Sequence, residues 1–300
     1  MRIKNRVASI TDYSAIIALS PITSPLRTEL LFNRATAIRD SSPIDEFIEN
    51  INNLNLFWAN LDKDLPVTIA SAIFMGYFSA VEGYIRALIR NLVSVDVYSL
   101  KSVEQKNITF GAALHHNKNL LPESLMDEFS FISSVNIITT FKELISIDLV
   151  LDDLTRNEFD KICQMRHCAV HRFGKLGAKN AICLGLQEHQ RLFEKPLELK
   201  NNDLAAISSI LRSFVGAVNN SIYKAILDRT FPVIPTGKKE SKKVAPSLWR
   251  NNYKDDRKLF YKYYSTFSSK IEGSPSAKEM YTVFINQKNS ELARNTAPKQ

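Results

Sequence analysis

The sequence predicts an all-α fold, on three observations. Only nine of the 300 residues are glycine, which disfavours an all-β fold that depends on tight turns. Apolar residues recur at helical spacing along most of the chain, and the one short stretch that resembles a strand covers 181–185. Hydrophobic residues make up 45% of the chain and charged residues 23%, as in globular proteins. We therefore expect a bundle of helices.

Prolines and polar residues indicate where these helices begin and end. Ser42 followed by Pro43 is typical of a helix N-terminus, and Pro66 opens the longest helix. Gly174 is placed to end the helix that precedes it. The expected helices cover residues 7–18, 27–39, 43–61, 66–95, 124–147 with one break allowed, 154–173 and 202–230.

The positive charge is concentrated near the C-terminus. Residues 1–231 carry 25 basic and 25 acidic side chains, whereas residues 232–300 carry 14 basic and 6 acidic ones. The second region therefore holds the whole net charge of +8, which suggests an anionic partner such as nucleic acid. We expect an N-terminal helical extension over 1–41 and a helical domain over 42–231. A linker rich in proline and lysine follows over 232–248. The last part, over 249–300, is a basic aromatic helical tail that frays beyond residue 285.

Nothing in the composition indicates a membrane or an oxidising compartment. The longest strongly apolar run without a charge covers 65–81, which is 17 residues, and a spanning helix needs about 20. Asp12 and Tyr13 interrupt any apolar core of a secretion signal after the basic start. The three cysteines are too few for a disulfide framework. We expect a soluble, cytoplasmic protein with no membrane partner.

The most informative stretch is the expected helix within 159–175. Projected on a helical wheel, Arg166 falls in the middle of an apolar stripe, and His167 and His171 share one edge of it. The stripe consists of Phe159, Ile162, Cys163, Ala169, Val170 and Phe173. A guanidinium in such a place is costly unless it is paired with a buried carboxylate or binds an anion such as phosphate. In the last helical turn, the helix dipole favours a protonated imidazole at His171, which suits acid–base chemistry.

Arg166 and His171 form an Arg-x4-His pattern that resembles the motif of the HEPN superfamily. A polar residue follows the arginine directly, and Gly174 ends the helix as in many members of that family. An earlier helix, with Glu82 near its centre, also looks like the acidic helix that HEPN domains place against the motif. The resemblance covers roughly 43–231. It does not explain the N-terminal residues, the tail, or an insert of about 60 residues between the two helices.

The resemblance implies an all-helical homodimer in which the two motifs meet across the interface. Many HEPN proteins are metal-independent RNA endonucleases, while others only bind. In the catalytic case His171 would manage the proton of the RNA 2′-hydroxyl, and Arg166 with Arg166 of the partner subunit would stabilise charge on the phosphate. His167 would contact the scissile phosphate or support Arg166. Cleavage would leave a 2′,3′-cyclic phosphate and a 5′-hydroxyl end, with no cofactor.

The same resemblance extends to a supporting residue, a biological role and protein partners. Glu82 either orients Arg166 across helices or pairs with Arg86 one turn away. A role as a toxin or antiviral defence effector, and a neutralising or activating protein partner, are implied by the family alone. Two alternatives remain open: a non-catalytic HEPN-like module that binds RNA or a partner protein, and a DNA-binding regulator led by the basic tail.

Basic residues near the motif and in the tail are the candidates for nucleic-acid contacts. They are Arg172, Lys175 and Lys179 after the motif, and Lys254, Arg257 and Lys258 in the tail. Aromatic residues are interleaved with the basic ones of the tail. They either stack on single-stranded nucleic acid or dock on the body as one face of an amphipathic helix. We favour docking, because large exposed aromatic patches are unusual.

A zinc site is a weaker alternative at the motif. Cys163, His167 and His171 follow one another at intervals of four residues, and together they span about 12 Å of helix, too far for one ion. His115 with His116, or an acidic side chain, would have to complete a site on the two histidines of the motif. We therefore expect no metal ligands.

Overall fold

The computed structural model describes residues 16–17, 22–36, 41–231 and 248–296. The contacts divide the chain into two units, residues 1–40 and residues 41–300. All regular elements of the described ranges are helices, and the one β-type pairing found there is an isolated bridge between Lys175 and Pro196. The expectation of an all-α fold is therefore confirmed.

In its described residues, the first unit contains one short 3-10 helix, η1 (Thr28–Leu30). The predicted helix over 27–39 is wrong for its described part, and the prediction over 7–18 lies almost wholly outside the described residues. The apolar side chains of Leu30, Leu31 and Phe32 are exposed. Because a short helix gains most of its stability from packing, an unburied apolar face gives this segment little reason to be helical.

The second unit begins with the antiparallel pair α1 (Pro43–Asn55) and α2 (Val67–Val95). The side chain of Ser42 accepts a hydrogen bond from the backbone N–H of Asp45, so the predicted start of α1 is confirmed. The predicted end at Leu61 is wrong by six residues. Beyond Asn55 the chain forms turns whose residues are mostly solvent-exposed, although Trp58 packs against the core and donates a hydrogen bond to Tyr77.

α2 is the central helix of this unit. It is also the one helix of the described residues whose length and composition would allow it to cross a membrane. Of its most apolar stretch of 18 residues, however, 61% is buried inside the fold. The buried core helices of water-soluble proteins can have the same length and apolar composition. Its composition is therefore weak evidence for a membrane span.

The remaining helices follow in chain order. They are α3 (Val97–Val103), α4 (Phe110–His115), η2 (Leu121–Met126), α5 (Ser134–Ile145), α6 (Asp153–Arg172), α7 (Ala178–His189), η3 (Gln190–Leu192), α8 (Asn201–Arg229), α9 (Tyr253–Phe267) and α10 (Ala277–Thr296). The expected helix over 124–147 is therefore a short 3-10 helix followed by α5, and the possible strand over 181–185 lies inside α7. A kink at Gly185, with φ +109°, interrupts α7 there.

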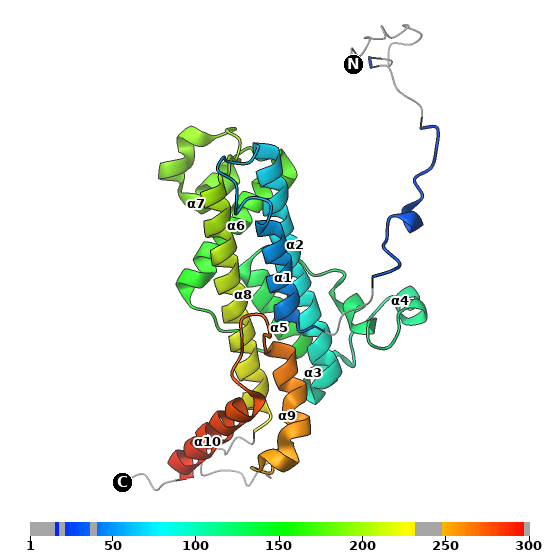
Figure 1. The fold of residues 1–300 in the computed structure, drawn as a ribbon, viewed down its shortest axis with the longest axis vertical. Coiled ribbons are helices and arrows are strands. Elements are labelled where there is room, and N and C mark those ends of the chain that lie inside the picture. Colours follow the sequence, from blue (N-terminus) through cyan, green and yellow to red (C-terminus); the bar gives the residue numbers. More distant parts are fainter. Residues whose placement is uncertain (1–15, 18–21, 37–40, 232–247, 297–300) are drawn as a thin grey trace. The chain divides into compact units, whose positions relative to one another are not determined.

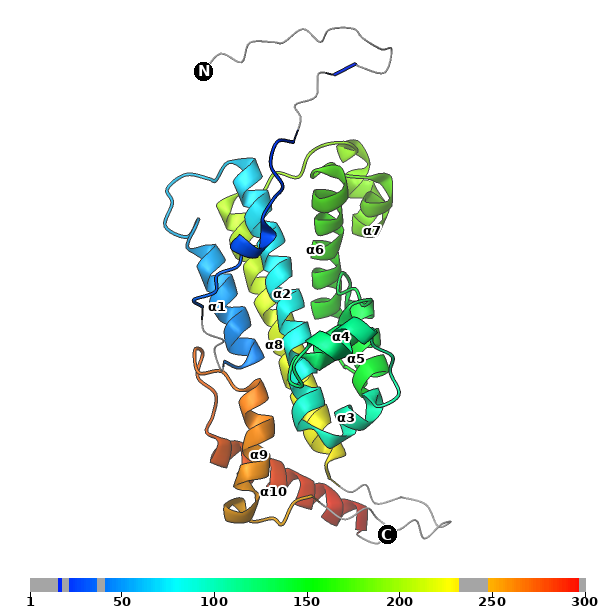
Figure 2. The same ribbon diagram turned by 90° about the vertical axis from the view of Figure 1, so that its right-hand side faces the viewer.

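α2 and α8 run side by side through the bundle, with α1 packed against both and α6 against α8 (Figures 1 and 2). The rings of Phe159 in α6 and Phe214 in α8 stack with centroids 3.8 Å apart, and both are fully buried. Tyr84 in α2 donates a hydrogen bond to the buried amide of Asn219 in α8. The first contact packs α6 against α8, and the second joins α8 to α2.

The C-terminal helices α9 and α10 belong to the same unit rather than to a separate tail. Trp249, Phe260 and Tyr263 are buried, so the docking interpretation of the tail aromatics is confirmed, and these rings are not free to stack on nucleic acid. α10 continues to Thr296, so the predicted fraying from 285 is wrong within the described residues. Of the predicted linker over 232–248, all but the last residue lies outside the described residues.

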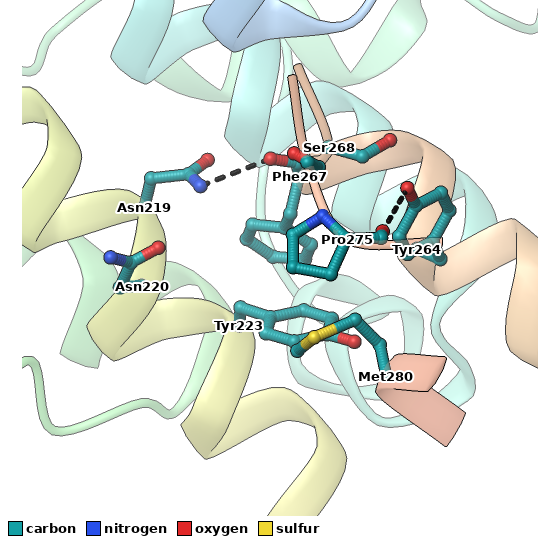
Figure 3. A pocket seen from close by; sticks show the side chains of 9 residues that line it. Asn219, Asn220, Tyr223, Tyr264, Phe267, Ser268, Pro275 and Met280 are labelled. Atoms are coloured by element: carbon teal, nitrogen blue, oxygen red, sulfur yellow. Dashed lines mark hydrogen bonds between the residues drawn. The ribbon is translucent and has the colours of Figure 1, made fainter. Parts of the chain in front are cut away.

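Polar bonds fix these C-terminal helices to the bundle. A cavity of about 110 Å³ lies where α8 meets α9 and the loop that follows α9 (Figure 3). Beside it, the side-chain amide of Asn219 donates a hydrogen bond to the backbone oxygen of Phe267 at 3.1 Å. The hydroxyl of Tyr264 donates another to the backbone oxygen of Pro275 at 2.7 Å. On α1, the buried carboxylate of Asp45 accepts hydrogen bonds from the loop between α9 and α10. Burial acts to raise the pKa of Asp45, but these hydrogen bonds outweigh it and hold that pKa below its usual value.

Candidate functional site

Helix α6 carries the Arg-x4-His motif at its C-terminal end. The carboxylate of Asp152 accepts the backbone N–H of Thr155 and so fixes the start of the helix. At the other end Phe173 adopts a left-handed conformation, with φ +51°, and Gly174 follows with φ +89°. The backbone N–H of Gly174 bonds back to the carbonyl of Cys168, which closes the helix where the sequence predicted.

The segment after α7 braces this helix end. Leu197 donates its backbone N–H to the carbonyl of Gly174, and Leu176 exchanges backbone bonds with the same returning segment. The guanidinium of Arg172 is engaged in an ion pair with Glu194. Arg172 stays a candidate for RNA contacts, and in the structure its partly exposed guanidinium is held in this pair. The structure therefore gives Arg172 a bracing role.

The apolar stripe of α6 leaves the core halfway along the helix. Phe159, Ile162 and Cys163 are buried, as expected. Val170 is 43% exposed and Phe173 is 90% exposed. The predicted stripe therefore packs in the core over its first part and is exposed at its end. Arg166 lies at the point where the stripe turns from the core to solvent.

The guanidinium of Arg166 is half-buried and has no partner among the described residues. Its Nε lies out of contact with solvent and makes no hydrogen bond. The expected bridge to a buried carboxylate is not found in the described ranges. A buried donor left unsatisfied costs about 1–3 kcal/mol, and more when it is charged, so the site retains a cation that is available to an anion.

Glu82 does not orient this arginine. Its carboxylate pairs with Arg86, one turn further along α2, at 3.1 Å. Arg86 also approaches Glu123 in η2, and Arg90 does the same. Of the two roles expected for Glu82, the structure places it in the ion pair within its own helix.

His167 and His171 lie together on the exposed edge of α6. Their ring centroids are 4.6 Å apart and the rings are tilted by 50°. Burial lowers the pKa of His167 below its ordinary value of 6.5, and the charge of His171 lowers it further. Lys179 and Arg166 act in the same direction. His167 is therefore mostly neutral at pH 7 and can accept a proton or a hydrogen bond.

The charges that depress the pKa of His167 also mark out a small cationic site. Arg166, His171 and Lys179 all lie within electrostatic range of that imidazole. Lys175 is exposed at the end of the same helix. An anion placed here would meet several unpaired donors within one small region.

Lys254, Arg257 and Lys258 are exposed on α9, at the opposite end of α8. Gly174, at the motif end of α6, accepts a backbone hydrogen bond from Leu197, just before α8 begins. Trp249, just before α9, donates a side-chain hydrogen bond to Thr230, just after α8 ends. The 29 residues of α8 between them extend about 42 Å. These three basic residues therefore do not share a site with the motif, and they stay candidates for nucleic-acid contacts at a separate place on the unit.

The residues of the alternative zinc site do not come together in the described residues. No group of three or more His, Cys, Asp or Glu side chains there is arranged to hold a metal ion. Burial raises the pKa of Cys163 far above its usual value, so this thiol stays protonated and is a poor ligand. His115 and His116 lie at the end of α4, in a different part of the unit.

Two features of the site were not expected from the sequence. Asn180 in α7 is buried and donates to the side chain of Gln164 at 2.9 Å, which anchors α7 beside the motif. Glu194 holds the end of α6 through Arg172. Both contacts join residues at least 16 positions apart in the chain, and local spacing carries no signal for such pairs.

Comparison with protein-family models, with curated proteins and with solved structures finds no match for this chain. The class of protein that the structure defines is therefore an all-α bundle with a half-buried, unpaired arginine and two adjacent histidines at one helix end.

Proposed function

We propose that this chain is a metal-independent RNA endonuclease of the HEPN type, acting as a cytoplasmic homodimer. The observation that carries the proposal is the arrangement at the end of α6. An unpaired guanidinium at Arg166, a pKa-depressed imidazole at His167 and an exposed imidazole at His171 occupy one small region. These are the groups that phosphodiester cleavage through the RNA 2′-hydroxyl requires.

In this mechanism the RNA supplies its own nucleophile. His171 takes the proton of the 2′-hydroxyl, the 2′-oxygen forms a bond to phosphorus, and the bond from phosphorus to the 5′-oxygen breaks. The leaving 5′-oxygen receives this proton back from the His171 imidazolium, so the products are a 2′,3′-cyclic phosphate and a 5′-hydroxyl end. Arg166 stabilises the charge that develops on the phosphate, and neutral His167 supports the same group by a hydrogen bond. DNA, which lacks the 2′-hydroxyl, is not cleaved.

The exposed end of the α6 stripe supports the homodimer. Phe173 exposes a large apolar side chain, and its left-handed backbone is unfavourable for a bulky residue. Neither the exposure nor the strain is compensated within one subunit, which points to a role in binding. A two-fold interface through Val170 and Phe173 would bury both and bring the two copies of Arg166 together.

The same proposal includes a role as a toxin or antiviral defence effector with a neutralising or activating protein partner. This part rests on the resemblance of the motif alone. Lys175 and Lys179 are the proposed contacts to the RNA backbone, since both are exposed beside the histidines.

The decisive experiment is incubation of the purified protein with a labelled RNA pool, with and without EDTA. The wild type is expected to cleave in both conditions and to leave cyclic-phosphate ends. His171→Ala and Arg166→Ala are expected to lower the rate at least about 100-fold, since acid–base and charge stabilisation each contribute that much. His116→Ala, an exposed histidine outside the site, is the matched control and is expected to cleave normally.

Other outcomes would each replace the proposal. Cleavage that EDTA abolishes would show a metal-dependent enzyme. RNA that is bound but never cleaved, in the presence of cell extract as a source of an activator, would show the non-catalytic binding module. Duplex DNA binding that falls with added salt and survives His171→Ala would favour the DNA-binding regulator.

A further inference from the structure

The insert between α2 and α6, which the HEPN resemblance leaves unexplained, contains a cavity of about 470 Å³. Its walls come from the end of α2, from α3, from η2 and from the loops that join them. Apolar side chains line most of it, namely Val93, Leu100, Val103, Ile108, Leu121 and Leu125. The volume falls in the range of about 300–1,000 Å³ that is typical of small-molecule sites.

The rim of this cavity carries unpaired positive charge. Lys106 and Lys118 line it, and their ammonium groups have no hydrogen bond or ion pair within the described ranges. Glu104 is the one acidic side chain that lines the cavity. The nearest further carboxylate in η2, that of Glu123, is already neutralised by two arginines of α2. An apolar interior with a net positive rim is complementary to a ligand with an apolar chain and an anionic head.

We propose that this cavity binds a free single-chain carboxylate amphiphile, a fatty acid in chemical class. The acyl chain would lie against Val93, Val103 and Leu125, and the carboxylate would meet Lys106 and Lys118 at the rim. A cavity of this size accommodates one drug-sized molecule, which fits one chain rather than the two chains of a membrane lipid. Leu100, which is 49% exposed although it lines the cavity, would be covered by the ligand.

Isothermal titration calorimetry of the full chain with sodium dodecanoate, below its micelle concentration, tests this site. One molecule is expected to bind per chain. Affinity is expected to rise about fourfold for each added methylene from decanoate to dodecanoate, the change that burial of one such group produces. Dodecyltrimethylammonium, which has a chain of the same length and the opposite charge, is the matched probe and is expected to bind more weakly.

The double variant Lys106→Glu with Lys118→Glu is expected to lower dodecanoate affinity about tenfold or more and to reverse the preference between the two probes. Both lysines are exposed, so the variant is expected to fold, which circular dichroism checks. Lys101→Glu, an exposed lysine of α3 that does not line the cavity, is the control and is expected to leave binding unchanged.

Three results would overturn this assignment. The first is equal binding of both probes to the wild type and the double variant, which would mean apolar adsorption without recognition of the head group. The second is self-association of the wild type that dodecanoate does not affect and that Leu100→Asp abolishes, which would make the groove an interface between copies. The third is binding of an acidic amphipathic peptide with no binding of dodecanoate, which would assign the groove to a protein partner.

Discussion

Buried charge is paired at one end of the helical unit and unpaired at the other. At the end formed by α3, α9 and the last turn of α8, the carboxylate of Asp96 is fully buried and accepts hydrogen bonds from Arg229, Tyr263 and the backbone of Ser99. At the motif end, Arg166 is half-buried and unpaired. The apolar side chains differ as well, since Trp249 is buried at the first end while Phe173 is 90% exposed at the other.

This difference separates stabilising charges from available ones. A buried ion that is fully hydrogen-bonded fixes the helices that supply its partners, because removing one partner leaves the others buried and unpaired. An unpaired ion contributes nothing to the fold and keeps its binding capacity for a ligand. The comparison therefore predicts large losses of stability from substitutions at the Asp96 end, and losses of binding or activity with little loss of stability from substitutions at the motif end.

The largest effect is expected for Asp96→Ala. The substitution removes a carboxylate that holds α2, α3, α8 and α9 together, and it leaves the guanidinium of Arg229 without its counterion. Breaking a buried pair in this way costs about 3–5 kcal/mol. Urea unfolding followed by circular dichroism measures the loss.

Glu158→Ala is the matched control for that experiment. Glu158 also pairs with a basic side chain, that of Lys161 at 2.6 Å, but the pair is solvent-exposed. Exposed pairs contribute little, so this variant is expected to stay close to the wild type. Similar losses for the two carboxylates would contradict the distinction between the two ends.

The sequence predicted the helices whose ends are set by local chemistry. Ser42 with Pro43 and the pair Phe173–Gly174 act within one turn, and the structure confirms both boundaries. The expected end of α1 at Leu61 was wrong, and so was the expected fraying beyond 285, where Lys288 of α10 pairs with Asp228 of α8, a contact that local spacing does not predict. Helical periodicity reported an apolar stripe correctly but could not tell which part of it faces the core.

The candidate site shows the same division. The spacing of Arg166, His167 and His171 on one helix could be derived from the sequence, because the helix itself brings them together. The ion pair of Glu194 could not be derived, since it depends on how the chain returns after α7. The placement of Lys254 beyond the opposite end of α8, a helix about 42 Å long, also required the fold.

A smaller effect, of opposite sign, is expected for Phe173→Asn. Asparagine tolerates the left-handed backbone better than a bulky residue, so the free energy of unfolding of the monomer is expected to rise by about 1 kcal/mol. The same change removes the exposed ring and is expected to abolish the proposed homodimer and RNA cleavage. Light scattering after gel filtration measures the oligomeric state. Unfolding is measured at a dilution where the wild type and the variant are both monomeric.

A matched substitution sharpens this test. Phe110 is also highly exposed, on α4, and Phe110→Asn removes a ring of the same size from a surface outside the proposed dimer interface. This control is expected to keep the homodimer and the cleavage rate. A dimer that survives Phe173→Asn would remove the support that the end of α6 gives to the two-fold interface.

The smallest effect concerns the pH dependence set by His167. Burial, followed by the like charges of His171, Lys179 and Arg166, lowers the pKa of this imidazole below 6.5 in the folded protein. The unfolded chain therefore binds more protons than the folded chain as the pH falls through 6.5, and the fold loses stability there. His167→Gln is expected to lose less stability than the wild type between pH 7.5 and pH 5.5.

Proton NMR titration of the imidazole C2–H measures the same pKa directly, with urea-unfolded protein as the reference. The midpoint of His167 is expected to lie below that reference, and to rise in His171→Ala because one neighbouring positive charge is gone. It is also expected to rise when an uncleavable 2′-deoxy oligonucleotide binds, since a phosphate beside the ring favours the imidazolium. A midpoint that the oligonucleotide leaves unchanged while it binds would place the anion away from His167, and would move the proposed site off this end of α6.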